Sequence, residues 1–238
     1  MTSQEMEIAF KQGLDKFDSL NYPDFQTDQI ELLLNQAQDQ YVKQRYGSNN
    51  LKKQSFEETQ KRTEDLKNVV VNAILTPAVN ALDNINTEAR FVILPDGTFP
   101  IGAPWPKYWI AIQELTGVSY VGCNGATVTD RVFTKAIQHD DYSKLINNPF
   151  GKPTEGKILR LMENGRVELI PPAGTTITDY HIRYIKEPVR ISITNSVDCE
   201  LSSMCHQEIV NAAVSIALEG IESRRTQGFE QVVQNKQE

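Results

Sequence analysis

Reactive side chains are scarce in this sequence of 238 residues. It contains only three histidines and three cysteines. The few histidines leave little choice of a general base near neutral pH. Cys123, Cys199 and Cys205 are odd in number and far apart, which argues against a disulfide framework and indicates a reducing cytoplasm during folding.

Long apolar runs and an excess of positive charge are also absent. No stretch is apolar for long enough to span a bilayer, and the acidic start is not typical of a signal peptide. The 24 Lys and Arg residues are outnumbered by 31 Asp and Glu residues, which gives a formal net charge of -7. General nucleic-acid binders need the opposite balance, so the composition argues against this class, although a local basic patch is allowed.

The most apolar helical pattern lies near the C-terminus, over residues 200–225. Ser202 or Ser203 can cap this helix, and a helix so apolar is expected to be nearly enclosed by other elements. A polar tail, residues 227–238, follows it. One face of the helix repeats at steps of three and four residues: Cys205, Ile209, Ala212, Ala213, Ile216 and Ala217.

Helical spacing also recurs three times near the N-terminus. Thr2 and Glu5 form a capping box for a helix that runs to about residue 20. Thr27 caps a second helix, which Gly47 ends. A third is predicted over residues 55–76, polar at first and apolar later. The apolar positions of the three helices are Met6, Phe10, Leu14, Phe17 and Leu20, then Ile30, Leu33, Leu34, Ala37 and Tyr41, then Leu66, Val69, Val70, Ala73 and Ile74.

From about residue 90 the pattern becomes that of strands. Asn164-Gly165 is the strongest hairpin signal. Because parallel strands need long crossovers, the short turns between the candidates favour an antiparallel sheet or a small barrel. The strand candidates are residues 91–94, 108–123, 127–138, 157–162, 167–170 and 180–186.

The sequence therefore predicts an α+β fold. Its helical bundle, made of N-terminal helices and a long C-terminal helix, carries an inserted antiparallel β platform that is a sandwich or a small barrel. The predicted parts are residues 1–85, the N-terminal helical part; 86–195, the β platform; 196–226, the C-terminal helix packing on the N-terminal helices; and 227–238, the polar tail.

Motifs for catalysis and cofactor binding are weak. We find no phosphate loop, dinucleotide-type glycine fingerprint, nucleophile elbow or paired-histidine zinc helix. His139, Asp140 and Asp141 are consistent with a divalent-metal site, but such a run before a helix is more typical of a loop and helix cap. The sequence thus predicts no catalytic residue, no cofactor-binding residue and no metal ligand.

Two other groups of side chains have a structural and a functional interpretation. Cys199, Cys205 and His206 are close enough in sequence for zinc, yet they lack a paired Cys-x-x-Cys, and Cys205 falls on the apolar face of its helix. Buried structural thiols are therefore favoured. The aromatic residues Trp105, Tyr108, Trp109, Tyr120 and Phe133 suit a stacking surface for a ligand, but a sheet core uses the same residues more often.

Several segments together resemble a known family. The segment DFQTDQIELLLNQAQ at residues 24–38 is similar to the opening of neck proteins of crAss-like phages, and HDD at 139–141, NPFGKP at 148–153 and Arg160 resemble the middle of the same proteins. YHIRYIKEP at 180–188, CEL at 199–201 and HQEIV at 206–210 resemble the closing segment of head-to-tail adaptor proteins, including the tail tubular protein A group of short-tailed phages.

The resemblance implies a virion structural protein, a ring subunit below the portal, in a homo-oligomeric ring that is commonly twelvefold. The implied partners are other copies of the chain, the portal protein and other ring or tail proteins, with genomic DNA passing through the lumen without specific binding and no membrane involved. The implied location is the portal vertex, or neck, of the virion, after assembly in the host bacterial cytoplasm. The family supplies no catalytic residues.

Alternative functions remain open on the sequence. One is a metal-dependent enzyme that uses Asp140, Asp141 and His139. Another is a tail terminator, or a transient assembly factor that leaves the particle. For the adaptor, we expect acidic side chains to line the lumen so that DNA passes without sticking, and residues 227–238 to become ordered on the portal or on a neighbouring ring.

Overall fold

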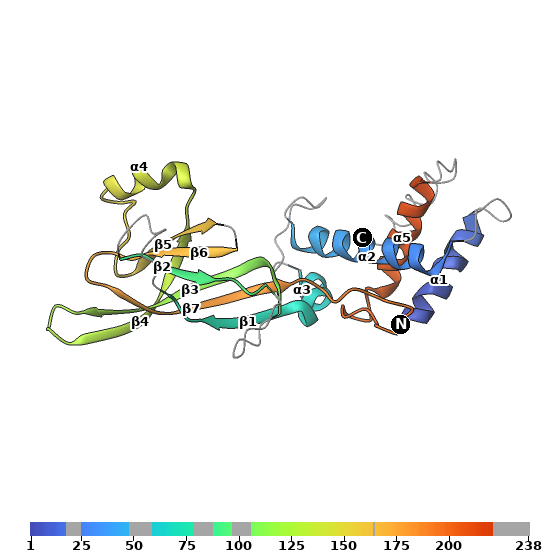
Figure 1. The fold of residues 1–238 in the computed structure, drawn as a ribbon, viewed down its shortest axis with the longest axis horizontal. Helices are drawn as coiled ribbons and strands as arrows, with labels where there is room; N and C mark the ends of the chain where they lie inside the picture. Colours follow the sequence, from blue (N-terminus) through green and yellow to red (C-terminus); the bar gives the residue numbers. More distant parts are fainter. Residues whose placement is uncertain (18–24, 48–58, 79–87, 97–105, 164, 221–238) are drawn as a thin grey trace. The chain divides into compact units, whose positions relative to one another are not determined.

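The computed structural model describes residues 1–17, 25–47, 59–78, 88–96, 106–163 and 165–220 (Figure 1). The chain has two compact units. The helical unit consists of Met1–Val69 and Pro188–Glu238, and the sheet unit consists of Val70–Glu187. Five α-helices and a seven-stranded sheet occur in the described parts, so the mixed helix and sheet composition predicted from the sequence is confirmed.

In the helical unit, one helix lies against two others. The C-terminal helix α5 contacts both α1 and α2, while α3 contacts α2. The described helices combine moderate length with limited hydropathy, and none of them could cross a membrane. Their bounds are α1 (Ser3–Phe17), α2 (Thr27–Tyr46), α3 (Gln60–Leu66), the short 3-10 helix η2 (Lys67–Val69) and α5 (His206–Gly220).

The N-terminal capping box is confirmed. The backbone N–H of Thr2 donates to Oε2 of Glu5 at 2.9 Å, and the backbone N–H of Glu5 donates to Oγ1 of Thr2 at 3.2 Å. The start of α2 differs from the prediction. Thr27 is already helical, and the backbone N–H of Gln26 donates to the side chain of Gln29 at 3.2 Å, so the cap lies one residue earlier.

Helix α5 is shorter at its N-terminus than the sequence predicts. It begins at His206, because residues 203–205 form a turn in which the Cys205 N–H donates to the Ser202 carbonyl at 3.0 Å. Residues 221–226 of the predicted helix lie outside the described residues. A Cβ at Gly13 of α1 would lie 2.9 Å from Cγ2 of Val214, so the glycine lets α1 and α5 approach closely.

The sheet is antiparallel at every strand pair except one. Strand β4 runs parallel to β5, and the connection between them contains the 3-10 helix η3 (His139–Asp141) and α4 (Tyr142–Asn147). The prediction of a wholly antiparallel platform is therefore wrong at this pair, where a helical crossover returns the chain in the same direction. The strand order is β1-β7-β3-β4-β5-β6-β2, with β1 (Val70–Leu75), β2 (Arg90–Ile93), β3 (Tyr108–Val121), β4 (Thr127–Ala136), β5 (Lys157–Glu163), β6 (Arg166–Ile170) and β7 (Thr176–Lys186).

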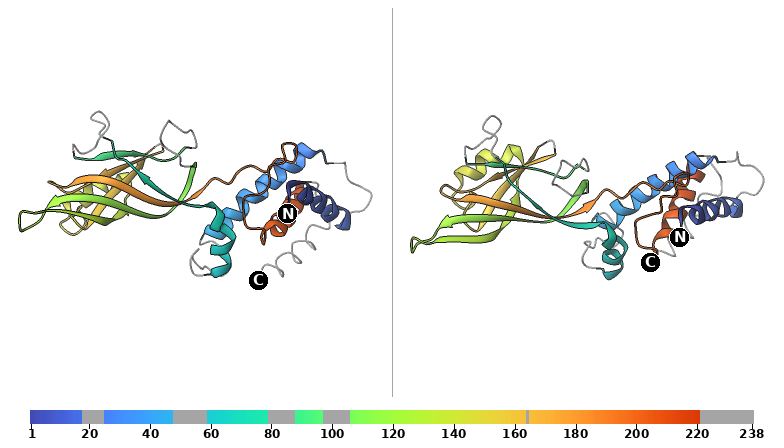
Figure 2. Two further views of the ribbon diagram at one scale, coloured as in Figure 1. Left: turned by 90° about the horizontal axis from the view of Figure 1, so that it is seen from below. Right: turned by 60° about the horizontal axis from the view of Figure 1, so that its bottom comes forward.

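The sheet curls so that its ends approach each other, and Figure 2 shows it from two further sides. Ala78, three residues after β1, pairs with Phe91 of β2 through two backbone hydrogen bonds of 2.7 and 2.9 Å. The Tyr108 N–H of β3 donates to the carbonyl of Pro95, just after β2, at 2.7 Å. All seven strands supply the core inside this curl, which includes Val92, Val118, Val132, Ile158, Val167 and Tyr180 with Leu75. Of the two predicted forms, the single curled sheet is closer to a small barrel than to a sandwich.

The predicted third helix is wrong over its second half. Helix α3 ends at Leu66, and Val70–Leu75 is the edge strand β1, antiparallel to β7. The other strand predictions are confirmed, and so is the hairpin at Asn164-Gly165. Strands β5 and β6 pair from Glu163 with Arg166 onward, and Gly165 has a φ of 76°. Asn164 itself lies outside the described residues.

Candidate functional site

His139, Asp140 and Asp141 lie at the start of the crossover and are largely exposed. Lys144 donates to Oδ1 of Asp141 at 3.1 Å, and Nε2 of His139 lies 3.2 Å from the Met162 carbonyl oxygen. No group of three His, Cys, Asp or Glu side chains that could hold a metal occurs within the part of the chain that the structure describes. These residues form the short turn that precedes α4.

The cysteines of the helical unit are buried and hydrogen-bonded. The thiol of Cys199 donates to Oε1 of Gln38 at 3.4 Å, and that of Cys205 donates to the Ser202 carbonyl at 2.8 Å. Burial raises the pKa of Cys199 to about 11 and that of Cys205 to about 12, so both stay protonated near neutral pH. Their burial agrees with the interpretation of both as buried structural thiols.

The ring of His206 is also used within the chain. Its Nε2 lies 3.0 Å from the Leu201 carbonyl oxygen, and its Nδ1 lies 3.0 Å from the terminal nitrogen of Met1. Both ring nitrogens thus contact groups of the chain itself, which ties the start of α5 to the N-terminus.

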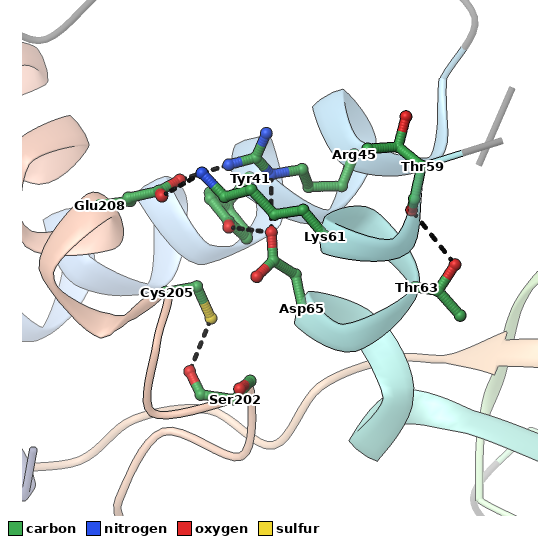
Figure 3. A network of polar contacts seen from close by, with 9 residues as sticks. All are labelled: Tyr41, Arg45, Thr59, Lys61, Thr63, Asp65, Ser202, Cys205 and Glu208. Carbon is green, nitrogen blue, oxygen red and sulfur yellow. Dashed lines mark hydrogen bonds and ion pairs between the residues drawn. The ribbon is translucent and has the colours of Figure 1, made fainter. Parts of the chain in front are cut away.

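Polar side chains of three helices form a network in the helical unit (Figure 3). Arg45 of α2 pairs with Asp65 of α3 at 3.2 Å and with Glu208 of α5, which also accepts from Lys61 at 2.9 Å. Tyr41 donates its hydroxyl to Asp65 at 2.8 Å, and its ring faces the Arg45 guanidinium at 4.7 Å. Burial raises the pKa of Tyr41, so the hydroxyl remains a donor. The network therefore links α2, α3 and α5.

A second polar row on α2 holds the segment that leads from the sheet back to α5. Asn35 exchanges two hydrogen bonds with the backbone of Ile191, of 2.8 and 2.9 Å. One oxygen of Glu31 accepts the N–H groups of Ile193 and Thr194 at 2.6 and 2.8 Å, and Gln38 donates to the Val189 carbonyl at 3.1 Å. These α2 residues belong to the segment that resembles crAss-like phage neck proteins, and their role here is to fix the fold.

The predicted aromatic cluster is split by the structure. Tyr108 and Tyr120 pack against the core of the sheet unit, and Trp109 is partly buried. Phe133 is instead 61% exposed on the outer face of β4, contrary to the core interpretation. Trp105 lies outside the described residues.

The outer face of the sheet carries an open hollow of about 290 Å³ that spans β1, β7, β3 and β4. Its lining includes the apolar side chains of Ile74 and Leu115 and the cationic side chains of Arg131 and Arg183. Nε of Arg183 donates to Oδ1 of Asn72 at 2.8 Å, which holds that side chain beside the hollow. An open hollow with apolar residues and cationic neighbours is suited to binding another surface.

Comparison with known proteins agrees with a role in assembly. The family model described as phage tail ring protein 3/4 matches residues 1–228. The chain belongs to this family of phage tail ring proteins. Members of the family are structural ring components of phage virions, and the resemblance to crAss-like phage ring proteins is confirmed.

Two curated relatives come from one phage. Ring protein 3 of Bacteroides phage crAss001 is 25% identical over 236 residues, which cover 92% of this chain and 95% of that protein. Ring protein 4/5 of the same phage is 33% identical over 100 residues, which cover 34% of this chain and only 42% of that protein. The match to a ring protein therefore extends over both the helical unit and the sheet unit.

Proposed function

We propose that this ring protein is a head-to-tail adaptor of the virion neck, which links the portal to the tail and forms part of the DNA channel. The family match over residues 1–228 is the observation that carries the proposal. Copies of the chain form a closed homo-oligomeric ring, twelvefold like the portal that it meets, and other ring or tail proteins bind on the far side. Assembly takes place in the host bacterial cytoplasm.

The charge of the chain supports passage of DNA through the ring. A net charge of -7 on every subunit gives the assembled ring a large negative charge. Acidic side chains at the lumen repel phosphates over roughly a Debye length, about 8 Å at physiological salt, so DNA slides without binding. A ring reconstruction with a lumen lined mainly by Lys and Arg would contradict this part of the proposal.

Electron microscopy of the purified chain, alone and mixed with the portal protein, tests the proposal. We expect rings that stack coaxially on the portal and share its symmetry. Quantitative mass spectrometry of mature particles separates the adaptor from a transient assembly factor, because an adaptor is present at an integer multiple of the portal copy number. Rings that bind only the far end of the tail would identify a tail terminator instead.

A further inference from the structure

The crossover between β4 and β5 presents an aromatic side chain to solvent. Phe150, just after α4, is 92% exposed, the most exposed large apolar side chain in the described chain. Aromatic side chains are enriched at protein–protein interfaces, where they often act as anchors. Its exposure therefore makes Phe150 a candidate interface residue.

Hydrogen bonds hold the backbone of the loop that carries Phe150. The Phe150 N–H donates to Oδ1 of Asn148 at 3.0 Å, and the N–H groups of Gly151 and Lys152 both donate to the Asn148 carbonyl at 3.0 Å. Nζ of Lys157 donates to the Phe150 carbonyl at 3.3 Å. Because the backbone of the loop is already ordered, binding through Phe150 costs less conformational entropy than binding through an unstructured loop.

The hollow on the outer sheet face has room for this anchor. Aliphatic cavities of about 150 Å³ hold a benzene molecule, and the hollow measures about 290 Å³. Ile74, which is 57% exposed, and Leu115 are apolar residues of its lining, and the exposed Phe133 pairs with Leu115 across the strands.

The anchor and the hollow lie on different parts of the sheet unit. The hollow covers β1, β7, β3 and β4, whereas the crossover packs over β5 and β6, where Tyr142 lies against the cluster of Leu159 and Leu161. Figure 1 shows α4 on the side of the sheet unit away from β1. One molecule cannot fill its own hollow in this way, but a neighbouring copy can, and repeating such a head-to-tail contact closes a ring.

The crossover carries carboxylates, whereas the border of the hollow carries arginines. Arg131 and Arg183 border the hollow, and no carboxylate lines it among the described residues. Asp140 and Asp141 lie at the start of the crossover, before α4, whereas Phe150 lies after α4, where Nζ of Lys157 contacts its carbonyl oxygen. Asp141 is paired with Lys144, and Asp140 has no ion pair within the described part of the chain, so its carboxylate is available to an arginine of a neighbour.

We propose that Phe150 of one copy inserts into the Ile74–Leu115 hollow of the next copy and forms the repeating contact between subunits. This inference rests on the proposed ring. It assigns the sheet unit a direct part in ring closure and names the two surfaces that meet.

Disulfide trapping in the full-length chain tests the contact. In a Cys123→Ser background, which removes the exposed natural thiol, Phe150→Cys and Ile74→Cys are made separately. We expect the mixed single variants to form one disulfide-linked dimer under mild oxidation, and a chain carrying both changes to form a ladder of linked oligomers. The matched control replaces Ile74→Cys by Ile93→Cys, since Ile93 is 67% exposed on the other edge strand, and it should give no cross-link.

Self-association provides the second readout. Phe150→Ala should raise the dissociation constant between copies by roughly thirtyfold or more in sedimentation velocity, as for a central anchor residue, whereas Ile93→Ala should change it by less than about threefold. Circular dichroism of each variant should match that of the parent chain, because both side chains are exposed.

The outcomes separate this contact from the adaptor role. Rings that form normally with Phe150→Ala, and without the Phe150–Ile74 cross-link, would overturn the contact and leave the adaptor in place. A trapped contact in a protein missing from mature particles would support the contact and refute the adaptor. A chain that stays monomeric and gives no cross-link, or a Phe150→Cys chain that links only to a different virion protein, would refute the inference.

Discussion

Removal of Arg45 is expected to destabilise the helical unit strongly. Its side chain is only 11% exposed, and that of Asp65 is 4% exposed. Arg45→Met keeps much of the apolar stem but leaves Asp65 buried, with the Tyr41 hydroxyl as its hydrogen-bond donor in the network. Breaking a buried ion pair from one side costs about 3–5 kcal/mol. Because Glu208 keeps Lys61 at 2.9 Å, we expect a loss near the lower limit, about 3 kcal/mol.

Lys67→Met is the matched control. Lys67 pairs with Glu64 at 2.7 Å, but both side chains are about half exposed. Exposed pairs of this kind contribute about 0–1 kcal/mol, since water already solvates both charges. Both variants replace a paired cation by methionine in the same unit, so the difference between them reflects mainly the burial of the pair.

Urea denaturation followed by two signals measures the effect. Far-UV circular dichroism reports mainly on the helices, while both tryptophans, Trp105 and Trp109, belong to the sheet unit and report on it by fluorescence. With a slope of about 1–3 kcal/mol per molar urea, a loss of about 3 kcal/mol lowers the helical midpoint by about 1–3 M. The reasoning is refuted if Arg45→Met unfolds within about 0.5 kcal/mol of Lys67→Met, or if only the fluorescence transition moves.

A double variant checks the cause. Asp65→Asn in the Arg45→Met background removes the carboxylate that has lost its counter-ion, so it should recover part of the lost free energy of unfolding. In the parent chain, the same Asp65→Asn change should be destabilising, because it breaks the pair with Arg45. Equal effects in the two backgrounds would mean that the residues are not coupled.

Three further outcomes are expected. Glu31→Gln should cost about 1 kcal/mol at neutral pH. The pKa of Glu31 is lowered from 4.5, chiefly by a backbone N–H donor. The stability that the Glu31 carboxylate contributes is therefore present above pH 4.5 and is lost as the pH falls through the folded pKa. Urea titrations of the parent chain and of Glu31→Gln should converge in acid. At mildly alkaline pH, Cys123 should react with a thiol reagent in the native protein, whereas Cys199 and Cys205 should react only on unfolding; three equal rates would contradict this. Deleting residues 227–238 should weaken portal docking in a pull-down and leave the circular dichroism unchanged, and unchanged docking would count against a role for this tail.

Local patterns in the sequence were sufficient for most elements but not for β1. Leu66, Val69, Val70, Ala73 and Ile74 fit helical spacing, yet from Asn72 to Leu75 exposed and buried residues alternate as in a strand. The β-branched residues in this stretch favour a strand, and antiparallel pairing with β7 decides the outcome. Such pairing joins residues more than a hundred positions apart, so a local window does not contain it.

The contacts of polar side chains also could not be predicted from the sequence. Glu31 and Asn35 look like solvated residues of an amphipathic helix, but they bind the backbone of residues 191–194. The spacing of four residues places both side chains on one side of α2, and this could be predicted from the sequence. The segment that they bind could not be predicted, because it is distant in the chain and has no regular pattern.

The candidate site was missed for a related reason: a search for reactive groups selects the wrong side chains in an assembly protein. The buried thiols and the network around Arg45 are occupied within the chain, whereas Phe150 and Ile74 carry no reactive group and are exposed. Burying one such side chain contributes only about 1.5–3 kcal/mol. In the proposed closed ring, however, the proposed contact recurs once per subunit, so its loss would weaken every interface. Ring formation should therefore be far more sensitive to Phe150→Ala than association of a single pair of subunits.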